Sequence, residues 1–492
     1  MKLQTSTAAA TLKHIITYLL VVIFCIIPCL VKAQVINTNT TIDSTKIYGV
    51  DTNKVKIVGI QITGNRKTKG YIILREVPFA VGDSLWPNQT AVIFKQASTQ
   101  VYNTNLFTDV KTTAVNIDSH KIIINIAVKE KWYIYPTPQF QLADRSYNEW
   151  IKTYNADFNR VIYGVKFAHY NFSGRRDQLR VFLLNGYTRN YAFSYNAPYS
   201  NPNLTEGFAV AASFSQNREV GYKINFNNKL LNYKEDNFIR NSFSVRGTYS
   251  KRNSFFKRTA ISAVLNYLNV ADTIVSSKLN PNYFGANRSN QVFPDFVYAV
   301  SYSNTDNINY PRKGLIYGYG VAKRGFGFSG GTNSLVFSGT YSKYIPHGKK
   351  WFSNITTAGV LKLPFKQAFI NQRAIGQGDL SLRGLEVYFI DGVAAAATKY
   401  TLTKQVAAFN IKVPFKIKAI PYVPFKIFAK GYTDVGYSYN TKEFATRLSN
   451  KFLYTGGVGI DILTFYDIVI KLEYSFNQIG EKGLFLSTNG GF

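Results

Sequence analysis

Most of the chain after Trp132 alternates between apolar and polar residues. The alternation is visible in residues 242–249 and 334–341. In residues 468–476 the Ile, Leu, Tyr and Phe side chains share one face of the pattern, and a mostly polar set shares the other. Successive side chains of a β-strand point to opposite faces. This period of two therefore predicts a long series of β-strands, each with one apolar face.

Residues 54–131 have a different pattern, in which strand-like and helix-like segments are mixed. Turn residues separate the segments, and apolar residues in the longest helical segment recur at helical spacing. The predicted order is β-α-α-β-β, over residues 55–62, 68–77, 88–106, 109–117 and 121–128. We expect a small α+β domain here.

The strand-rich part of the chain is long enough for a large barrel. Residues 132–492 comprise 492 − 131 = 361 positions. At roughly 22 residues for each strand and its connection, this length gives about 16 strands. Only a closed barrel satisfies every backbone polar group of a sheet in hydrocarbon. We therefore expect a transmembrane β-barrel of about 16 antiparallel strands over residues 132–492.

The first residues resemble a secretory leader. Lysines precede an apolar run over residues 15–30, and small residues stand at the expected cleavage positions before Gln34. We expect a signal peptide over residues 1–33 and a polar linker over residues 34–53. A lipoprotein leader acylated at Cys29 is the weaker alternative, because a proline precedes that cysteine. Both cysteines lie in the expected leader, so no disulfide or thiolate site is expected in the mature chain.

Composition adds a strong positive charge and many aromatic residues. The chain has 58 Lys and Arg against 27 Asp and Glu, a net charge of +31, and 15% of its residues are aromatic. Aromatic girdles are usual in membrane barrels. The basic residues are spread along the whole chain, so we expect no nucleic-acid partner. They could face anionic lipid, steer an acidic partner, or keep loops soluble.

The sequence carries little that resembles an active site. Beyond the leader the histidines are His120, His169 and His347, which are far apart and lack metal-ligand spacing. No nucleophile elbow, P-loop or dinucleotide fingerprint occurs in a fitting context. We expect no enzyme activity, no cofactor and no metal.

A glycine-rich segment at residues 376–385 contains the main candidate site. It places Arg383 and Gly384 among further glycines, within a region otherwise made of strands. An arginine in a barrel lumen needs a carboxylate partner, because its guanidinium stays charged. Asp434, about fifty residues further on, is the candidate partner.

Several segments resemble, in the correct order, the bacterial surface-antigen superfamily, which includes the assembly factor BamA and the two-partner secretion transporters. Residues 54–131 resemble one POTRA domain of that family. Barrel segments that match are residues 171–175, 193–199, 311–314, 376–385, 432–436 and 483–492. The resemblance implies that Arg383 and Gly384 belong to a loop folded into the barrel, and that Arg383 pairs with Asp434.

The resemblance also implies two further sets of residues. The family supplies a second carboxylate from a strand that corresponds here to residues 410–414, where Asn410 stands in the place of the acid. Leu385 stands where an aromatic residue is usual. The last residues resemble the terminal recognition strand of outer-membrane barrels, through Leu484, Leu486 and Phe492.

The function implied is insertion or translocation of other proteins at the outer membrane of a Gram-negative cell, with the POTRA domain in the periplasm. The expected partners are outer-membrane lipid and an unfolded or partner β-barrel or secreted protein, which would be held by the POTRA domain and the barrel seam. Accessory periplasmic proteins are further candidate partners. The alternatives are a passive outer-membrane channel and a structural surface barrel.

Overall fold

The computed structural model describes residues 54–118, 120–142, 155, 157–327, 331–376, 380–412, 422–441 and 445–489. The expected leader (1–33), the expected linker (34–53) and Phe492 lie outside the described residues, as do residues 377–379 of the glycine-rich segment.

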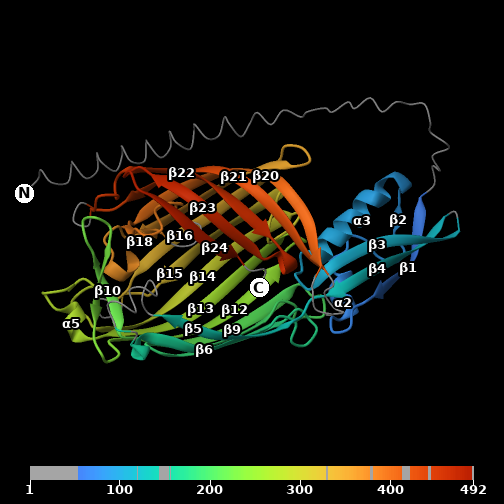
Figure 1. Ribbon diagram of the computed structural model, residues 1–492. Coiled ribbons are helices and arrows are strands. Elements are labelled where there is room, and N and C mark those ends of the chain that lie inside the picture. The colour runs from blue at the N-terminus through green and yellow to red at the C-terminus, as the bar shows by residue number, and fades with distance from the viewer. Residues whose placement is uncertain are drawn as a thin grey trace, which may run out of the picture. The chain divides into compact units, whose positions relative to one another are not determined.

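The N-terminal domain contains the predicted β-α-α-β-β order and one additional short strand. Its elements are β1 (Val55–Thr63), α2 (Gly70–Leu74), β2 (Ser84–Leu85), α3 (Pro87–Tyr102), β3 (Phe107–Asp118) and β4 (Lys121–Glu130). They form a sheet in the order β2-β1-β4-β3, in which β1 is parallel to β4 and β3 is an edge strand. Alternate isoleucines of β4 pack with Ala97 and Val101 of α3 in its core. Figure 1 shows α3 lying beside the strands of this sheet.

Both helices are shorter than the sequence pattern predicts. Helix α2 ends at Leu74, four residues before Pro78, which disfavours helical backbone at Val77. Helix α3 begins with Pro87 at its first position and ends at Tyr102. Asn105 follows with a φ of 65°, a left-handed conformation that a helix cannot continue through.

The rest of the chain forms one antiparallel sheet of 16 strands that curls into a barrel (Figure 1). The predicted fold class and strand number are confirmed. From one end of the sheet to the other the strands are β5 (Ile134–Leu142), β6 (Val161–His169), β7 (Gln178–Gly186), β8 (Thr188–Ala197), β9 (Glu206–Asn217), β12 (Arg240–Arg252), β13 (Lys257–Val270), β14 (Asn290–Thr305), β15 (Gly314–Arg324), β16 (Ser334–Pro346), β17 (Trp351–Leu363), β20 (Ala394–Lys412), β21 (Tyr422–Tyr439), β22 (Phe452–Leu463), β23 (Val469–Asn477) and β24 (Lys482–Asn489).

Shorter elements lie in the connections between barrel strands. They are β10 (Glu219–Ile224) paired with β11 (Leu230–Lys234), α5 (Asp272–Val275), β18 (Arg373–Ile375) paired with β19 (Ile390–Asp391), and three single-turn helices at Phe158–Arg160, Phe369–Asn371 and Phe465–Asp467. In the described part of the chain, no helix is both long enough and apolar enough to cross a bilayer.

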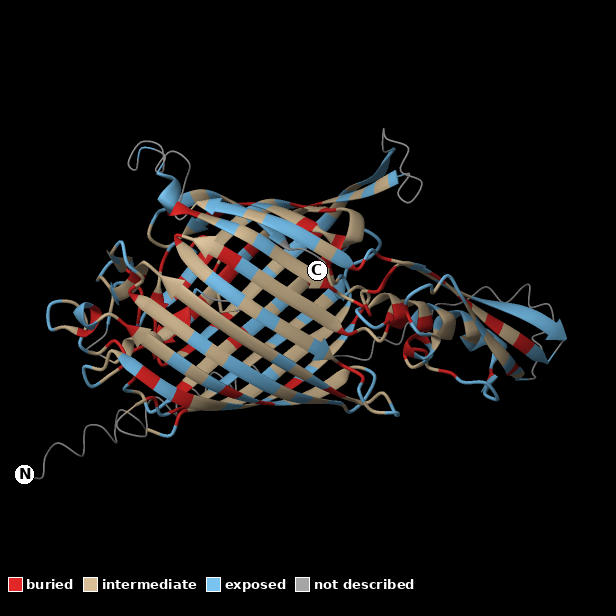
Figure 2. Cartoon of the chain, turned by 90° about the horizontal axis from the view of Figure 1, so that it is seen from below, coloured by how far each residue is buried: buried red, intermediate tan, exposed pale blue. Residues whose placement is uncertain are grey.

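The alternation of side chains gives the barrel an apolar outside. In β13, Ile261, Leu265 and Tyr267 are exposed, whereas Ser262 and Val264 between them are buried (Figure 2). The same holds for β23, in which Leu472, Tyr474 and Phe476 are exposed while Glu473 and Ser475 are buried. An outer face of exposed Leu, Ile, Phe and Tyr suits contact with lipid chains, so the strands are the membrane-spanning elements.

Residues 364–393, between β17 and β20, form the segment that positions the candidate site. Apolar residues of this segment pack in one cluster with residues of the barrel wall: Ala374, Ile375, Leu382, Leu385, Tyr388, Ile390, Ala395, Ala397, Leu448 and Leu453. This packing holds the segment against β20, β21 and β22, which carry the charged residues described next.

Candidate functional site

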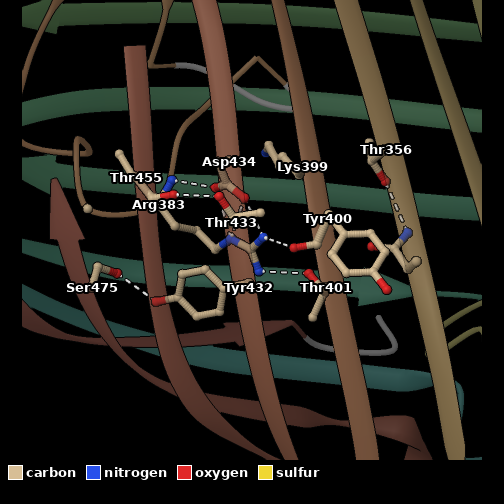
Figure 3. A network of polar contacts seen from close by, with 12 residues as sticks. Thr356, Arg383, Lys399, Tyr400, Thr401, Tyr432, Thr433, Asp434, Thr455 and Ser475 are labelled. Atoms are coloured by element: carbon tan, nitrogen blue, oxygen red, sulfur yellow. Dashed lines mark hydrogen bonds and ion pairs between the residues drawn. The ribbon is translucent and has the colours of Figure 1, made fainter. Parts of the chain in front are cut away.

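Arg383 and Asp434 are in direct contact (Figure 3). Asp434, on β21, is fully buried. The Arg383 Nε donates to Asp434 Oδ2 at 3.0 Å, its Nη2 donates to Oδ1, and its backbone N–H donates to Oδ2 at 2.9 Å. The guanidinium lies 3.9 Å from the centre of the Tyr432 ring, and its Nη1 donates to Thr401 Oγ1 at 3.0 Å. Such a charge-assisted, forked contact fixes both the position and the direction of the arginine.

Gly384 explains how the chain brings Arg383 to this place. Its φ is +85°, a left-handed conformation that favours glycine. A Cβ on Gly384 would also lie 2.9 Å from the Cβ of Ser475 on β23. The carbonyl of Gly384 accepts a hydrogen bond of 2.8 Å from Asn477 Nδ2. A side chain here would push the loop away from β23. Gly384 is therefore needed to place Arg383 at its site.

The charge network continues beyond the pair. Arg383 Nη1 lies 3.8 Å from Glu473 Oε1 on β23, and Lys430 Nζ lies 2.6 Å from the same oxygen. Lys430 also contacts Asp461 on β22, which accepts a hydrogen bond of 2.9 Å from Tyr310. Arg383 is thus the end of a chain of alternating charges across β21, β22 and β23.

The role expected for Asn410 needs correction. Among the described residues, Asn410 is exposed on β20, opposite Pro424, and makes no contact with Arg383. The second acid near Arg383 is Glu473 instead. Leu385, the other departure from the family pattern, is buried with Leu382 in the apolar cluster of the loop. An aliphatic side chain therefore packs there without an aromatic ring.

The two ends of the barrel sheet, β5 and β24, are not joined by a ladder among the described residues. The Tyr170 N–H donates to the Tyr133 carbonyl at 2.9 Å, and the β5–β6 register continues from there without a shift. Antiparallel partners alternate between bonded and non-bonded pairs. The backbone N–H and C=O groups of the even-numbered residues of β5 therefore point away from β6. Two of these residues are Pro136 and Pro138, which have no N–H.

The same reasoning applies to β24. The Asn477 N–H donates to the Glu481 carbonyl at 3.1 Å, and the β23–β24 register continues from that pair. Leu484 and Leu486 therefore turn their backbone groups toward the free side. Their side chains are 67% and 70% exposed, which places them on the outer, apolar face. We call the free edges of β5 and β24 the seam.

A second charged cluster, which we call the junction cluster, links the N-terminal domain to the barrel. Glu76, just after α2, accepts hydrogen bonds of 2.9 and 2.7 Å from Arg252 at the end of β12. The Tyr199 hydroxyl donates to Glu76 at 3.1 Å and accepts from Arg176 at 2.8 Å and from Arg258 at 3.0 Å. Burial opposes ionisation of Glu76, but the hydrogen bonds and charge of Arg252 hold its pKa below the ordinary value.

Arg75 completes the junction cluster by stacking on Tyr199, with its guanidinium 3.7 Å from the ring centre. Burial lowers the pKa of Arg75 to about 10, although Tyr199 and Glu76 oppose this shift. Glu76 is thus the acidic partner of Arg252 and lies next to Arg75, in a cluster with an excess of arginines.

Gly174 allows the N-terminal domain and the barrel to approach closely. It has a φ of +84°, and a Cβ there would lie 2.3 Å from the Lys67 carbonyl oxygen. Its own carbonyl accepts a hydrogen bond of 3.0 Å from the Lys69 N–H. This glycine belongs to the segment 171–175, which sequence analysis related to the family turn, and any side chain would separate the two domains.

A cavity of ≈ 1370 Å³ lies between the N-terminal domain and the barrel. It is lined by aromatic and basic residues from both parts, among them Lys131, Tyr466 and Lys426. Lys131 is almost fully buried and its Nζ has no hydrogen-bond partner, and burial lowers its pKa. No group of three or more His, Cys, Asp or Glu side chains in the described residues is placed to hold a metal ion.

The comparisons with known proteins agree with this architecture. Residues 55–131 match the family model for POTRA, described as the surface antigen variable number repeat. The comparison with curated proteins finds no match.

Two solved structures illustrate the similar proteins. BamA from Haemophilus ducreyi lacking POTRA domains 1–3 is 14% identical, with a TM-score of 0.48, and the match covers 89% of this chain and 84% of that one. CdiB from Escherichia coli is 11% identical, with a TM-score of 0.47, and the match covers 91% and 92%.

A POTRA domain followed by a 16-stranded barrel with an apolar outer face defines a class: a membrane-spanning β-barrel protein with an N-terminal POTRA domain. The family model assigns residues 55–131 to the POTRA family.

We call the charged residues Arg383, Asp434, Lys430, Asp461 and Glu473 the lumen network. Sequence reasoning missed the junction cluster and most of the lumen network. Glu473 could have been found, because the alternation of β23 already placed it opposite the apolar face. Glu76 could not, because its partners Arg252 and Tyr199 lie more than a hundred positions away. Only the fold brings such distant charges together.

Proposed function

We propose that this protein inserts or translocates other proteins at the outer membrane, and that its client is an unfolded or partner β-barrel or secreted protein. The observation that carries the proposal is the seam, where backbone groups of β5 and β24 have no strand partner among the described residues. Free N–H and C=O groups on an edge strand are a template for pairing with another extended chain.

The POTRA domain offers a first place for the client. Strand β3 is the edge of its sheet, and Val115 and Ile117 are exposed near the end of that strand. An extended client segment can add to such an edge through main-chain hydrogen bonds, with apolar side chains supporting the contact. Accessory periplasmic proteins could use the same edge.

The seam offers the second place. Pro136 and Pro138 remove two donors from the β5 edge, so a closing ladder between β5 and β24 would lack two hydrogen bonds. Strand β24 keeps its donors and acceptors at Leu484 and Leu486. We therefore propose that a client strand pairs first with β24, whereas β5 is the edge that separates from β24.

We further propose that Arg383 and Asp434 hold the segment 380–393 inside the barrel while the seam exchanges partners. The pair is charge-assisted, and Asp434 is fully buried. Removing one partner of such a buried pair costs about 3–5 kcal/mol, because the other charge is left uncompensated. A loop held in this way keeps the lumen filled.

Replacing the seam prolines tests the proposal. The double variant Pro136→Ala and Pro138→Ala restores both donors, so β5 and β24 should pair more strongly and the chain should insert or export fewer clients. The measurement is the amount of other barrel proteins in the outer membrane and of partner proteins outside the cell, at matched levels of this chain. Pro311→Ala, in the turn before β15, is the control and should leave client levels unchanged.

Unchanged client levels in both the proline variant and a deletion of residues 54–131 would contradict the proposal. Planar-bilayer conductance then separates the alternatives. A large and steady current indicates a passive channel, whereas a closed barrel with no effect on clients indicates a structural surface protein.

A further inference from the structure

The β20–β21 hairpin is longer than the sheet on either side of it. Strand β17 pairs with β20 only as far as Lys404, and β22 pairs with β21 only as far as Lys426. Residues 406–412 of β20 therefore extend beyond β17, and residues 422–425 of β21 extend beyond β22. In the described part of the chain, residues 409–412 and 422–425 pair only with each other. At a rise of ~3.3 Å for each residue, the seven residues of β20 reach about 23 Å beyond β17, and the four residues of β21 reach about 13 Å beyond β22. We call residues 406–412 and 422–425 the hairpin extension.

The hairpin extension lies at the periplasmic end of the barrel. Consecutive connections of an antiparallel barrel alternate between its two ends, so the β20–β21 connection shares an end with the β22–β23 connection. That second connection contains Asp467, which accepts a hydrogen bond of 2.8 Å from Tyr102 of the POTRA domain. Tyr422, Pro424 and Lys426 of the hairpin also line the cavity beside the POTRA domain.

The two faces of the hairpin extension differ sharply. On one face Phe409 stacks on Phe425, with ring centres 5.7 Å apart, and Ile411 lies opposite Val423. The odd-numbered residues of β21 form the outer face, since Asp434 and other even-numbered residues are buried inside. The apolar face of the extension is therefore continuous with the lipid-facing surface of the barrel.

The charge of the hairpin extension and of the residues that adjoin it has one sign. Residues 404–412 and 422–426 contain Lys404, Lys412 and Lys426 and no acidic residue. Phe409 and Ile411 are 46% and 49% exposed, so the apolar face has no cover within the described residues. An exposed apolar face beside basic residues is the combination that binds an anionic membrane surface.

The start of the hairpin extension coincides with the edge of the membrane. Trp351 is exposed and Lys404 Nζ lies 5.0 Å from the centre of its ring, as expected where a barrel meets lipid head groups. The β20–β21 register shifts between Gln405 and Ala407, immediately beyond that level. A β-bulge bends the strand that carries it, so the hairpin can turn toward the membrane surface.

We infer that the hairpin extension binds the periplasmic leaflet of the outer membrane. In this arrangement Phe409, Ile411 and Phe425 enter the boundary between head groups and acyl chains. Lys404 and Lys412 then contact the phosphates of anionic phospholipids. The inference goes beyond the proposed function, since it requires only that the barrel spans a membrane.

Spin labels on single cysteines test this arrangement in the full chain, with Cys25 and Cys29 replaced by Ser. The labelled variants are Phe409→Cys and Asn410→Cys, which lie on opposite faces of the same strand. Leu402→Cys, on the outer wall of the barrel, is the control for lipid. Val115→Cys, an exposed apolar position of the POTRA domain, is the control for water.

The chain is reconstituted in vesicles of phosphatidylethanolamine and phosphatidylglycerol, and the label is probed with oxygen and with an aqueous nickel chelate. We expect the label at 409 to be protected from nickel, as at 402, and the label at 410 to be accessible. Vesicles of phosphatidylcholine alone, or the variants Lys404→Glu and Lys412→Glu, should shift the label at 409 toward water. A label at 409 as accessible to nickel as the one at 115 overturns the inference. So does protection that arises only when a periplasmic protein extract is added.

Discussion

The junction cluster and the lumen network both contain buried charged side chains, but their ratios of acidic to basic residues differ. In the junction cluster, Glu76 is surrounded by Arg75, Arg252 and the arginines bound to Tyr199. In the lumen network, the acids Asp434, Asp461 and Glu473 are interleaved with Arg383 and Lys430. A buried charge is stable only with a partner. The junction cluster therefore depends on a single acid, whereas in the lumen network three acids share the pairing with the buried cations.

This difference in the number of acids corresponds to a difference in what each cluster holds in place. The junction cluster binds a whole domain to the ends of β12 and β13, together with contacts such as the Tyr102–Asp467 and Lys69–Gly174 hydrogen bonds. The lumen network fixes one loop that also has an apolar cluster to support it. We therefore expect single substitutions at the junction to have larger effects than single substitutions in the lumen.

The largest effect is expected for Glu76→Gln. Arg252 loses its carboxylate and the neighbouring arginines lose the acid at the centre of their cluster, so the junction should weaken by about 5 kcal/mol, the upper end for a broken buried pair. Distances between spin labels on the POTRA domain and on a periplasmic turn should broaden. The exposed acid Asp109 supplies the control, because Asp109→Asn should leave the distances narrow. A narrow distribution for Glu76→Gln would show that the junction does not depend on this acid.

A smaller effect is expected for Arg383→Ala. Asp434 loses the guanidinium but keeps the Arg383 backbone N–H at 2.9 Å, so we expect a loss of about 3 kcal/mol, the lower end of the same range. Single-channel recording should detect longer open periods as the loop leaves the lumen. Arg312→Ala, whose salt bridge to Asp306 is in an exposed turn, is the matched control. Equal open times in the two variants would contradict the role of the pair.

Glu473→Gln should have a still smaller effect. Its contact with Arg383 is 3.8 Å long, and Lys430 keeps Asp461 as a partner when Glu473 becomes neutral. The loss should be about 1.5 kcal/mol, in the range of one hydrogen bond to a charged group. Thermal unfolding followed by heat-modifiable gel mobility measures it. A loss as large as that of Arg383→Ala would show that the lumen network also depends on one acid.

The smallest effect is expected when the pH is lowered from 7 to 5. The pKa of Glu76 is lower in the folded protein than in the unfolded chain, so its stabilising contribution is present above the unfolded value of about 4.3. The contribution is lost only as the pH falls through the lower, folded value. Label distances at the junction should thus be unchanged between pH 7 and pH 5. Broadening within that interval would mean that another group controls the junction.

Local patterns predicted much of this molecule. The period of two in residues 468–476 identified the apolar face of β23, and the strand-rich length gave the number of strands. The exact ends of the POTRA helices depend on local backbone features, such as the left-handed conformation of Asn105, that the spacing of apolar residues does not contain.

The candidate site was predicted only where a family pattern named both partners. Arg383 and Asp434 were paired in advance, whereas Asn410 was given a role that Glu473 occupies instead. The error arose because strand order decides which acid faces the loop, and residue spacing along the chain does not contain that order. Glu76 and Arg252, 176 positions apart, illustrate the same limit.

The most direct test of the account is amide hydrogen exchange in β24, measured by NMR in lipid nanodiscs. A free seam predicts that the amides of Leu484 and Leu486 exchange quickly, whereas those of Phe485 and Ser487, which face β23, exchange slowly. Equal, strong protection at all four amides would contradict the account, because it would show that β24 and β5 close the barrel with a complete ladder.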